Sequence, residues 1–378
     1  MIYLDNSATT RPTEAVRAAV VQAMSEGFFN PSALYAPAMQ AGFEMKKCRE
    51  MILKQLHCPQ YKVVFTGCGT EADNLMIWGT LASQREGTVL YSAAEHPAVK
   101  EPCSHAGAVQ GKEIPLTRDG VVDLEKLRGM MDESVKLICV MQVNNETGAI
   151  QPIKAISDLR NELCPKAYLH VDGVQGFMRV PFDMVKSGAD SYALSGHKIH
   201  APKGIGALVF SPKCRISPRL PGGGQENGMR SGTENTPGIA GLLAAIEGIP
   251  GDMEPMRQCK IALYRRLKEL IPAAVVNGPD PEGELAAPHV LNISLPPVRS
   301  ETMLHALEGD GIYVGIGSAC SSHKQKVSAT LQAMGIKQPQ AESALRFSLC
   351  PENTMEEMEA VAQAVKKHYD LLSRFSRR

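Results

Sequence analysis

The feature that most constrains this sequence is an alternation of short apolar runs with amphipathic segments between residues 61 and 210. Apolar runs that predict strands lie at 61–66, 88–92, 136–142, 168–172, 191–194 and 206–210. Helical periodicity lies between them, from about residue 72 and at 97–107, 123–131 and 153–163. Because such alternation builds right-handed βαβ units, we expect an α/β fold with a mostly parallel sheet covered by helices on both faces.

Polar side chains gather where these predicted strands end. The residues in question are Thr70, His96, Asn145, Asp172, Gln175 and Lys198. Ligands of parallel sheets bind beyond the carboxyl ends of the strands. The sequence therefore predicts that these six residues share one site at that edge of the sheet.

Two of these residues suggest a cofactor. Asp172 ends an apolar strand, and Lys198 stands in a loop of small residues that reads Ser-Gly-His-Lys at 195–198. A lysine can form a Schiff base with pyridoxal phosphate, while an aspartate keeps the pyridine nitrogen protonated. Taken alone, Lys198 is more readily explained as a surface lysine. The strand-end pattern is what favours the cofactor.

A glycine-bearing turn at 67–71, with the sequence Gly-Cys-Gly-Thr-Glu, joins a predicted strand to a predicted helix. Backbone N–H groups at such a helix start can cradle an anion, typically a phosphate. The turn can equally be a plain strand-to-helix connection, and the motif is too short to decide.

Composition excludes several classes of protein. Lys plus Arg and Asp plus Glu number 40 each, so no net charge attracts nucleic acid or an anionic membrane. No apolar run reaches the length of about 18 residues that a membrane helix needs, and the N-terminus lacks the pattern of a signal peptide. We therefore expect a cytoplasmic protein. The ten cysteines include no Cys-x-x-Cys pair, which suits neither a disulfide scaffold nor a zinc site, and no metal is expected.

After about residue 251 the pattern changes. Helices are predicted at 256–271, 301–308 and 354–372, and strands at 289–295 and 344–349. This looser order indicates a second, α+β domain.

Six short stretches stand in a fixed order along the chain: Tyr-Leu-Asp-Asn-Ser-Ala-Thr-Thr at 3–10, Asn-Asn-Glu-Thr-Gly at 144–148, His-Val-Asp-Gly-Val-Gln at 170–175, Ser-Gly-His-Lys at 195–198, Gly-Met-Arg-Ser-Gly-Thr at 228–233 and Gly-Ser-Ala-Cys-Ser-Ser at 317–322. Together they resemble the cysteine desulfurases, the NifS/IscS-like branch of the class V pyridoxal-phosphate enzymes. The resemblance runs from residue 3 to about residue 350.

This resemblance implies a type I pyridoxal-phosphate transferase fold. Its large cofactor-binding domain, expected at 13–250, would hold a mostly parallel seven-stranded sheet between helices. A smaller α+β domain, formed by 1–12 and 251–378, would carry the catalytic cysteine loop.

The resemblance also assigns cofactor-binding roles. Lys198 would form the Schiff base, Asp172 would pair with the pyridine nitrogen, and Gln175 would donate to the phenolate oxygen. The phosphate ligands would be Gly69, Thr70, Ser195, His197 and, from the partner subunit of a homodimer with shared active sites, Thr233. His96 would stack on the ring and could carry a proton, although its position alone suggests only a histidine at a helix start.

Substrate-binding roles would fall to Asn145, near the ring and the substrate carboxylate, and to Arg346, as a bidentate clamp on that carboxylate. Without the resemblance, Arg346 is more simply a charge at a strand edge. The sequence departs from the family pattern at Cys350 and Pro351, close to Arg346, which suggests a specialised paralogue.

Cys320 would be the nucleophile, because a thiol among small polar loop residues is accessible. The implied reaction removes sulfur from L-cysteine, with Lys198 and His96 carrying protons, and leaves L-alanine and a persulfide on Cys320. The sulfur would then pass to an iron–sulfur scaffold or a tRNA-thiolation protein. Alternatives are a selenocysteine lyase, another class V lyase or aminotransferase, a cofactor-free cysteine enzyme, or a sulfur carrier without catalysis.

Overall fold

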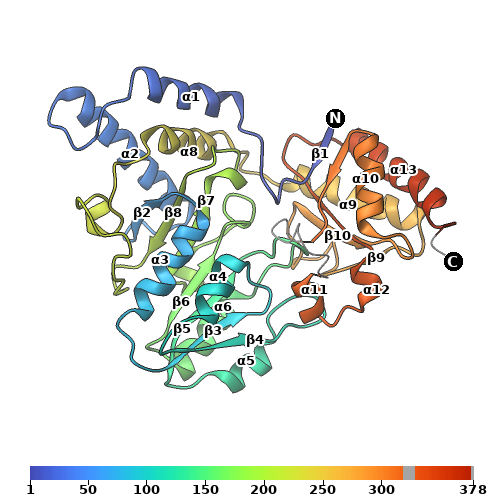
Figure 1. The fold of residues 1–378 in the computed structure, drawn as a ribbon, viewed down its shortest axis with the longest axis horizontal. Coiled ribbons are helices and arrows are strands. Elements are labelled where there is room, and N and C mark those ends of the chain that lie inside the picture. The colour runs from blue at the N-terminus through green and yellow to red at the C-terminus, as the bar shows by residue number, and fades with distance from the viewer. Residues whose placement is uncertain (318–327, 376–378) are drawn as a thin grey trace.

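A computed structural model describes residues 1–317 and 328–375 of this chain and confirms the predicted α/β fold (Figure 1). Its centre is a seven-stranded sheet in the order β2-β8-β7-β6-β5-β3-β4. The strands are β2 (Lys62–Thr66), β3 (Thr88–Ser92), β4 (Gln110–Ile114), β5 (Val135–Met141), β6 (Tyr168–Asp172), β7 (Ser191–Ser195) and β8 (Gly206–Phe210). Neighbouring strands are parallel except at β8, which is antiparallel to both β2 and β7.

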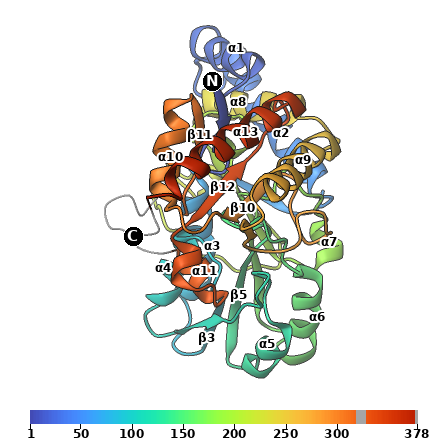
Figure 2. The same ribbon diagram turned by 90° about the vertical axis from the view of Figure 1, so that its right-hand side faces the viewer.

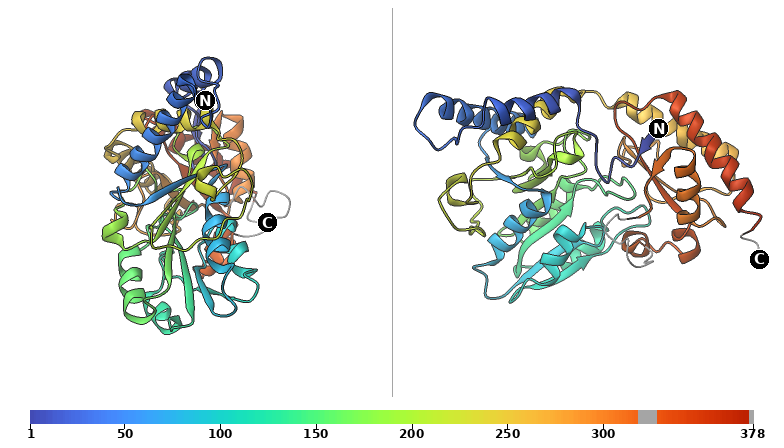
Figure 3. Two further views of the ribbon diagram at one scale, coloured as in Figure 1. Left: turned by 90° about the vertical axis from the view of Figure 1, so that its left-hand side faces the viewer. Right: turned by 45° about the horizontal axis from the view of Figure 1, so that its top comes forward.

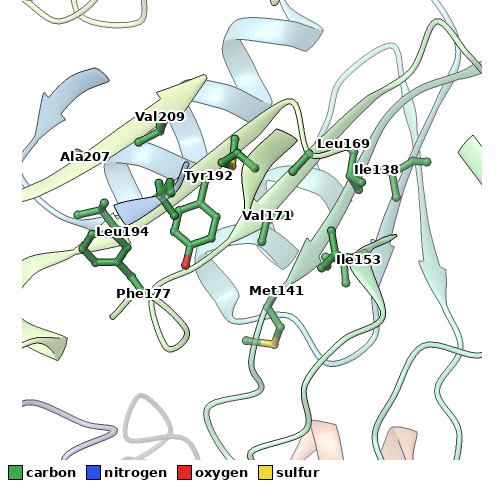
Figure 4. Close-up of a cluster of buried hydrophobic side chains, with 14 of the residues drawn as sticks. Ile138, Met141, Ile153, Leu169, Val171, Phe177, Tyr192, Leu194, Ala207 and Val209 are labelled. Atoms are coloured by element: carbon green, nitrogen blue, oxygen red, sulfur yellow. The ribbon is translucent and has the colours of Figure 1, made fainter. Parts of the chain in front are cut away.

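Helices cover both faces of this sheet (Figures 1 and 2). One face carries α3 (Gly69–Leu81) and α4 (Pro97–Ser104). The other carries α2 (Ala36–Gln55), α5 (Leu124–Met130), α6 (Ile153–Leu163), α7 (Met184–Ser187) and α8 (Thr236–Gly248), and α1 (Glu14–Ser25) packs on α8. Successive strand residues face opposite ways. Val64 and Leu137 belong to the hydrophobic cluster on the face covered by α3 and α4. Val63 and Ile138 belong to the hydrophobic cluster on the other face, part of which is shown in Figure 4. Both faces are therefore buried.

The remaining chain forms a separate hydrophobic cluster. Its antiparallel sheet has the order β12 (Ala344–Ser348), β10 (Val290–Ser294), β9 (Val275–Val276), and helices α9 (Glu254–Leu270), α10 (Ser300–Gly309) and α13 (Met355–Leu372) pack against it. The short helices α11 (Ala329–Ala333) and α12 (Gln338–Ala341) also lie in this stretch of the chain, but their buried residues Leu331 and Ala341 pack in the hydrophobic cluster of the seven-stranded sheet. The N-terminal strand β1 (Ile2–Leu4) pairs in parallel with β11 (Ile312–Val314), so the N-terminus lies in the same part of the molecule as the C-terminal helix α13 (Figure 3). The predicted division at residues 13 and 251 stays a prediction, which these separate clusters support.

Several elements were not predicted from the sequence, among them strand β4 and helix α8. Strand β4 lies at the sheet edge, where most of its side chains are exposed, and its sequence Gln-Gly-Lys-Glu-Ile is accordingly mostly polar. Helix α8 is apolar almost all round and largely buried, so it lacks the polar face that produces helical periodicity. In the described ranges, no helix combines the length and apolar character needed to cross a membrane.

Candidate active site

A cavity of about 270 Å³ lies beyond the carboxyl ends of the parallel strands. It gathers ten of the predicted site residues: Gly69, Thr70, His96, Asn145, Asp172, Gln175, Ser195, His197, Lys198 and Arg346. Thr233 is not among its lining residues and lies exposed in the loop before α8. Cys320 lies outside the described residues.

Lys198 enters the cavity from η1 (Gly196–Lys198), the turn that follows β7. Its Nζ donates hydrogen bonds to the main-chain oxygens of Ser7, at 2.5 Å, and Ala8, at 2.8 Å. Burial, reinforced by the charges of Arg179 and Arg346, lowers the pKa of Lys198 from 10.5 to about 7. A substantial fraction of this amine is therefore unprotonated near neutral pH, which is the form that attacks a carbonyl carbon.

Asp172 ends β6 with its carboxylate nearly buried, and Oδ1 accepts a hydrogen bond from the N–H of Val174 at 2.9 Å. Burial and the neighbouring Asp73 raise the pKa of Asp172 to about 7. A cationic N–H in the cavity would stabilise its ionised form, which suits a protonated pyridine nitrogen. Asp73, which the sequence analysis did not single out, also lines the cavity and lies 3.1 Å from Nε2 of the fully buried His170.

His96 caps the N-terminus of α4. Its Nδ1 accepts a hydrogen bond from the N–H of Ala98 at 3.1 Å, so the proton of the neutral ring sits on Nε2. Burial and, to a lesser degree, the charge of Lys198 lower the pKa of His96 to about 4. The ring is therefore neutral near pH 7, with one N–H to offer and no charge.

The start of α3 forms an anion cradle. The helix begins at Gly69 rather than near residue 72, and its N-cap residue Cys68 supplies no side-chain hydrogen bond to the first turn. A Cβ on Gly69 would lie 2.6 Å from Cγ2 of Val174, so this close approach requires glycine. Ser195 and His197 face the same cavity, which gives hydroxyl, imidazole and free N–H groups together. This donor set fits a phosphate.

Arg346, on β12 and nearly fully buried, also lines the cavity. Its Nη1 donates to the main-chain oxygen of Asn145 at 3.0 Å, and its Nη2 donates to Oδ1 of Asp5 at 2.7 Å. Its buried Nε has no partner among the described residues. The substitutions at Cys350 and Pro351 leave this geometry intact, because β12 continues to Ser348 and the N–H of Cys350 bonds Oδ1 of Asn353.

The N-terminal segment is the part of the site that sequence reasoning underestimated. The sequence analysis identified residues 3–10 as a family motif, without any contact to the lysine. In the structure, Ser7 accepts hydrogen bonds through its main-chain oxygen from Lys198 and, at 3.0 Å, from Nε2 of Gln175. Its N–H donates to Oγ of Ser348 on β12 at 2.8 Å. The segment therefore forms a wall of the cavity and links the seven-stranded sheet to β12.

Cysteine and metal chemistry elsewhere is limited. Eight of the nine described cysteines are buried thiols, and only Cys68 is exposed. In residues 1–317 and 328–375, no group of three or more His, Cys, Asp or Glu side chains could hold a metal ion.

Comparison with known proteins agrees with this geometry. The family model for aminotransferase class-V matches residues 2–361. The chain is 36% identical to cysteine desulfurase NifS of Azotobacter vinelandii, over 96% of this chain and 91% of that protein. Among solved structures, a NifS-like protein superposes with a TM-score of 0.89 at 32% identity, covering 98% of this chain and all of the other. SspA in complex with cysteine superposes with a TM-score of 0.81 at 28% identity, covering 93% of this chain and 99% of that one.

Proposed function

The chain belongs to the aminotransferase class-V family, and we infer that it is a cysteine desulfurase of the NifS/IscS type. It removes sulfur from L-cysteine and releases L-alanine. One observation carries this conclusion: a single cavity holds a lysine with a lowered pKa, a buried aspartate, a neutral histidine and a buried arginine, in a chain whose relatives are named cysteine desulfurases.

Pyridoxal phosphate fits the described cavity. The anion cradle of Gly69, Thr70, Ser195 and His197 would hold its phosphate. The ring would meet Asp172 at its nitrogen, Gln175 at its phenolate oxygen and His96 on its face, and Lys198 would hold it covalently. The bound cofactor supplies an electron sink that makes the α-proton of an amino acid acidic.

Lys198 and His96 divide the proton transfers. The unprotonated amine of Lys198 accepts the proton from the substrate Cα and can return a proton later, because its pKa of about 7 balances both directions near neutral pH. Neutral His96 offers Nε2–H toward the substrate sulfur. The thiolate of Cys320, which lies outside the described residues, would form an S–S bond with that sulfur as the substrate Cβ–S bond breaks. The electron pair of the broken bond would stay with Cβ, which takes up a proton and becomes the methyl group of L-alanine, while the persulfide remains on Cys320.

Arg346 would bind the substrate carboxylate. Arg346 lines the cavity, and a guanidinium can offer two parallel N–H donors to a carboxylate. Asp5 and the main-chain oxygen of Asn145 already hold the guanidinium in place, so little side-chain entropy remains to be lost on binding.

Arg346→Lys should therefore raise KM for L-cysteine by about 10- to 100-fold, with a smaller change in kcat, because an ammonium cannot form the two-pronged contact. Steady-state alanine formation measures both constants. The matched control is Arg266→Lys on α9, whose guanidinium pairs with Glu269 and Glu359 away from the cavity. An unchanged KM in Arg346→Lys would contradict the carboxylate role.

A homodimer would complete the site, with Thr233 of each subunit reaching the phosphate of the other. Thr233 is exposed and lies in the loop between η2 (Glu226–Gly228) and α8. Exposed apolar side chains also cluster around the α1–α2 connection: Phe28, Leu34, Tyr35, Met39 and Phe43. Exposed apolar clusters of this kind mark interaction surfaces.

After the reaction, the persulfide sulfur would pass to an acceptor protein, either an iron–sulfur scaffold or a tRNA-thiolation enzyme, in the cytoplasm.

The deciding experiment is incubation of the purified protein with L-cysteine and a thiol reductant. Equal amounts of alanine and sulfide should appear, and a visible absorbance band that borohydride removes should be present before substrate is added. Absence of the band would exclude the cofactor, and alanine formed from L-selenocysteine alone would identify a selenocysteine lyase instead.

A further inference from the structure

Arg179 contacts the Lys198 turn without lining the cavity and is buried, with 5% of its surface exposed. Its Nη1 donates a hydrogen bond to Oε1 of Gln175 at 3.2 Å, and its Nη2 donates to the main-chain oxygen of Lys198. Within the described chain, no carboxylate pairs with this guanidinium. The side chain thus connects the turn that carries Asp172 and Gln175 to the turn that carries Lys198.

The backbone around Arg179 is held tightly. Met178, the preceding residue, has a φ of 61°, a left-handed conformation uncommon outside glycine. A Cβ on Gly173 would lie 1.8 Å from the ring of Tyr192, and one on Gly176 would lie 2.0 Å from Oε1 of Gln142. Tyr192 belongs to the packed cluster shown in Figure 4. A strained conformation persists where the surroundings determine it, so this turn presents Arg179 in one fixed position.

The contact with Gln175 has a chemical consequence. A glutamine amide can face either way, but a guanidinium has only donors, so it must face the amide oxygen. The NH₂ group of Gln175 is therefore turned to the cavity side, where one N–H donates to the main-chain oxygen of Ser7 at 3.0 Å. The second N–H remains as the donor for a ligand.

From this geometry we propose that Arg179 is a positioning residue for the active site, which orients the Gln175 amide and fixes the Lys198 turn through one guanidinium. The role rests on the proposed function, since Gln175 and Lys198 act on the bound cofactor. Arg179 itself does not line the cavity, so it acts through these two residues rather than on the substrate.

The charge of Arg179 also bears on Lys198. After burial, Arg179 is the strongest influence that lowers the pKa of Lys198. The other charged or titratable groups around Lys198 are Arg346, Asp5, Asp172, His96 and His197. Removing the charge of Arg179 while leaving these groups in place should raise the pKa of Lys198, because a nearby cation disfavours its protonated form.

The test is spectroscopic titration of the holoenzyme carrying Arg179→Met. In the holoenzyme the nitrogen of Lys198 is part of the Schiff base, and a nearby cation disfavours its protonated form for the same reason. The pH midpoint of the visible band, which follows protonation of that nitrogen, should therefore rise by about one unit. The absorbance maximum of Arg179→Met should shift in the same direction as that of Gln175→Leu. The double variant should show no larger shift than Gln175→Leu alone, because it has no amide left to orient. Unchanged midpoint and maximum in Arg179→Met would overturn the proposal. A wild-type protein with no band would instead count against the proposed function.

Three further variants separate positioning from a general loosening of the structure. Arg160→Met removes another buried arginine, which pairs with Asp190 and bonds the main-chain oxygen of Ala167, and should leave midpoint and maximum unchanged. Arg179→Lys keeps the charge, so its midpoint should stay close to that of the wild type. If Arg179→Met does not fold, Arg179→Gln removes the charge with a polar side chain and should raise the midpoint likewise. Equal shifts in Arg160→Met and Arg179→Met would overturn the proposal.

Discussion

Replacement of Lys198 by alanine is expected to abolish the visible absorbance band that borohydride removes and to lower alanine formation by about a thousandfold or more. The amine at Nζ is both the covalent anchor for the cofactor and the proton carrier at the substrate Cα. The methyl group of alanine can do neither. The measurements are an absorbance spectrum before and after borohydride, and the rate of alanine release from L-cysteine.

Lys203→Ala is the matched control for this result. Lys203 is exposed, lies five positions later in the sequence Pro-Lys-Gly at 202–204, and does not line the cavity. Its removal should leave the band and the rate close to those of the wild type. A borohydride-sensitive band that survives in Lys198→Ala and disappears in Lys203→Ala would show that the covalent role belongs to the other lysine.

Replacement of Cys320 by serine should eliminate the protein-bound persulfide and lower sulfide release by about a hundredfold or more, because a serine hydroxyl stays protonated where a thiolate forms. The cofactor band should remain, since the residues proposed to hold the cofactor are unchanged. The gain of one sulfur atom by the protein after exposure to L-cysteine can be read by mass spectrometry of the intact chain.

The informative comparison is Cys68→Ser. Cys68 is the exposed cysteine of the described chain and borders the same cavity, which makes it the rival nucleophile. We expect Cys68→Ser to keep the persulfide that Cys320→Ser loses. The reverse outcome would assign the sulfur-accepting role to Cys68 and would overturn the role of Cys320.

The sheet was predictable because its strands are buried on both faces. Continuous apolar runs of this kind stand out between amphipathic helices, and the predicted runs at 88–92, 168–172 and 206–210 coincide with β3, β6 and β8. Strand β4 and helix α8 were not predicted, because neither carries a periodic pattern of apolar residues. Strand β4 is exposed and polar, and helix α8 is apolar almost all round.

Most of the candidate site followed from the same pattern. In a parallel sheet the carboxyl ends of neighbouring strands meet at one edge, so residues that follow separate strands, such as His96, Asp172 and Lys198, converge on one cavity. The roles of Gln175 and Arg346 needed the family resemblance, because an amide or a guanidinium in isolation does not indicate what it binds.

The sequence by itself therefore determined the parallel sheet, the edge at which the site lies and the side chains that reach it. Only the tertiary structure decided how those side chains are held. The main-chain oxygens of Ser7 and Ala8 receive Lys198, Asp5 holds Arg346, and Arg179 turns the amide of Gln175. Periodicity reports burial along one segment, whereas the first two of these contacts join segments far apart in the chain, and the third depends on the path of one tightly packed turn. Hydrogen bonds of this kind leave no periodic trace in the sequence.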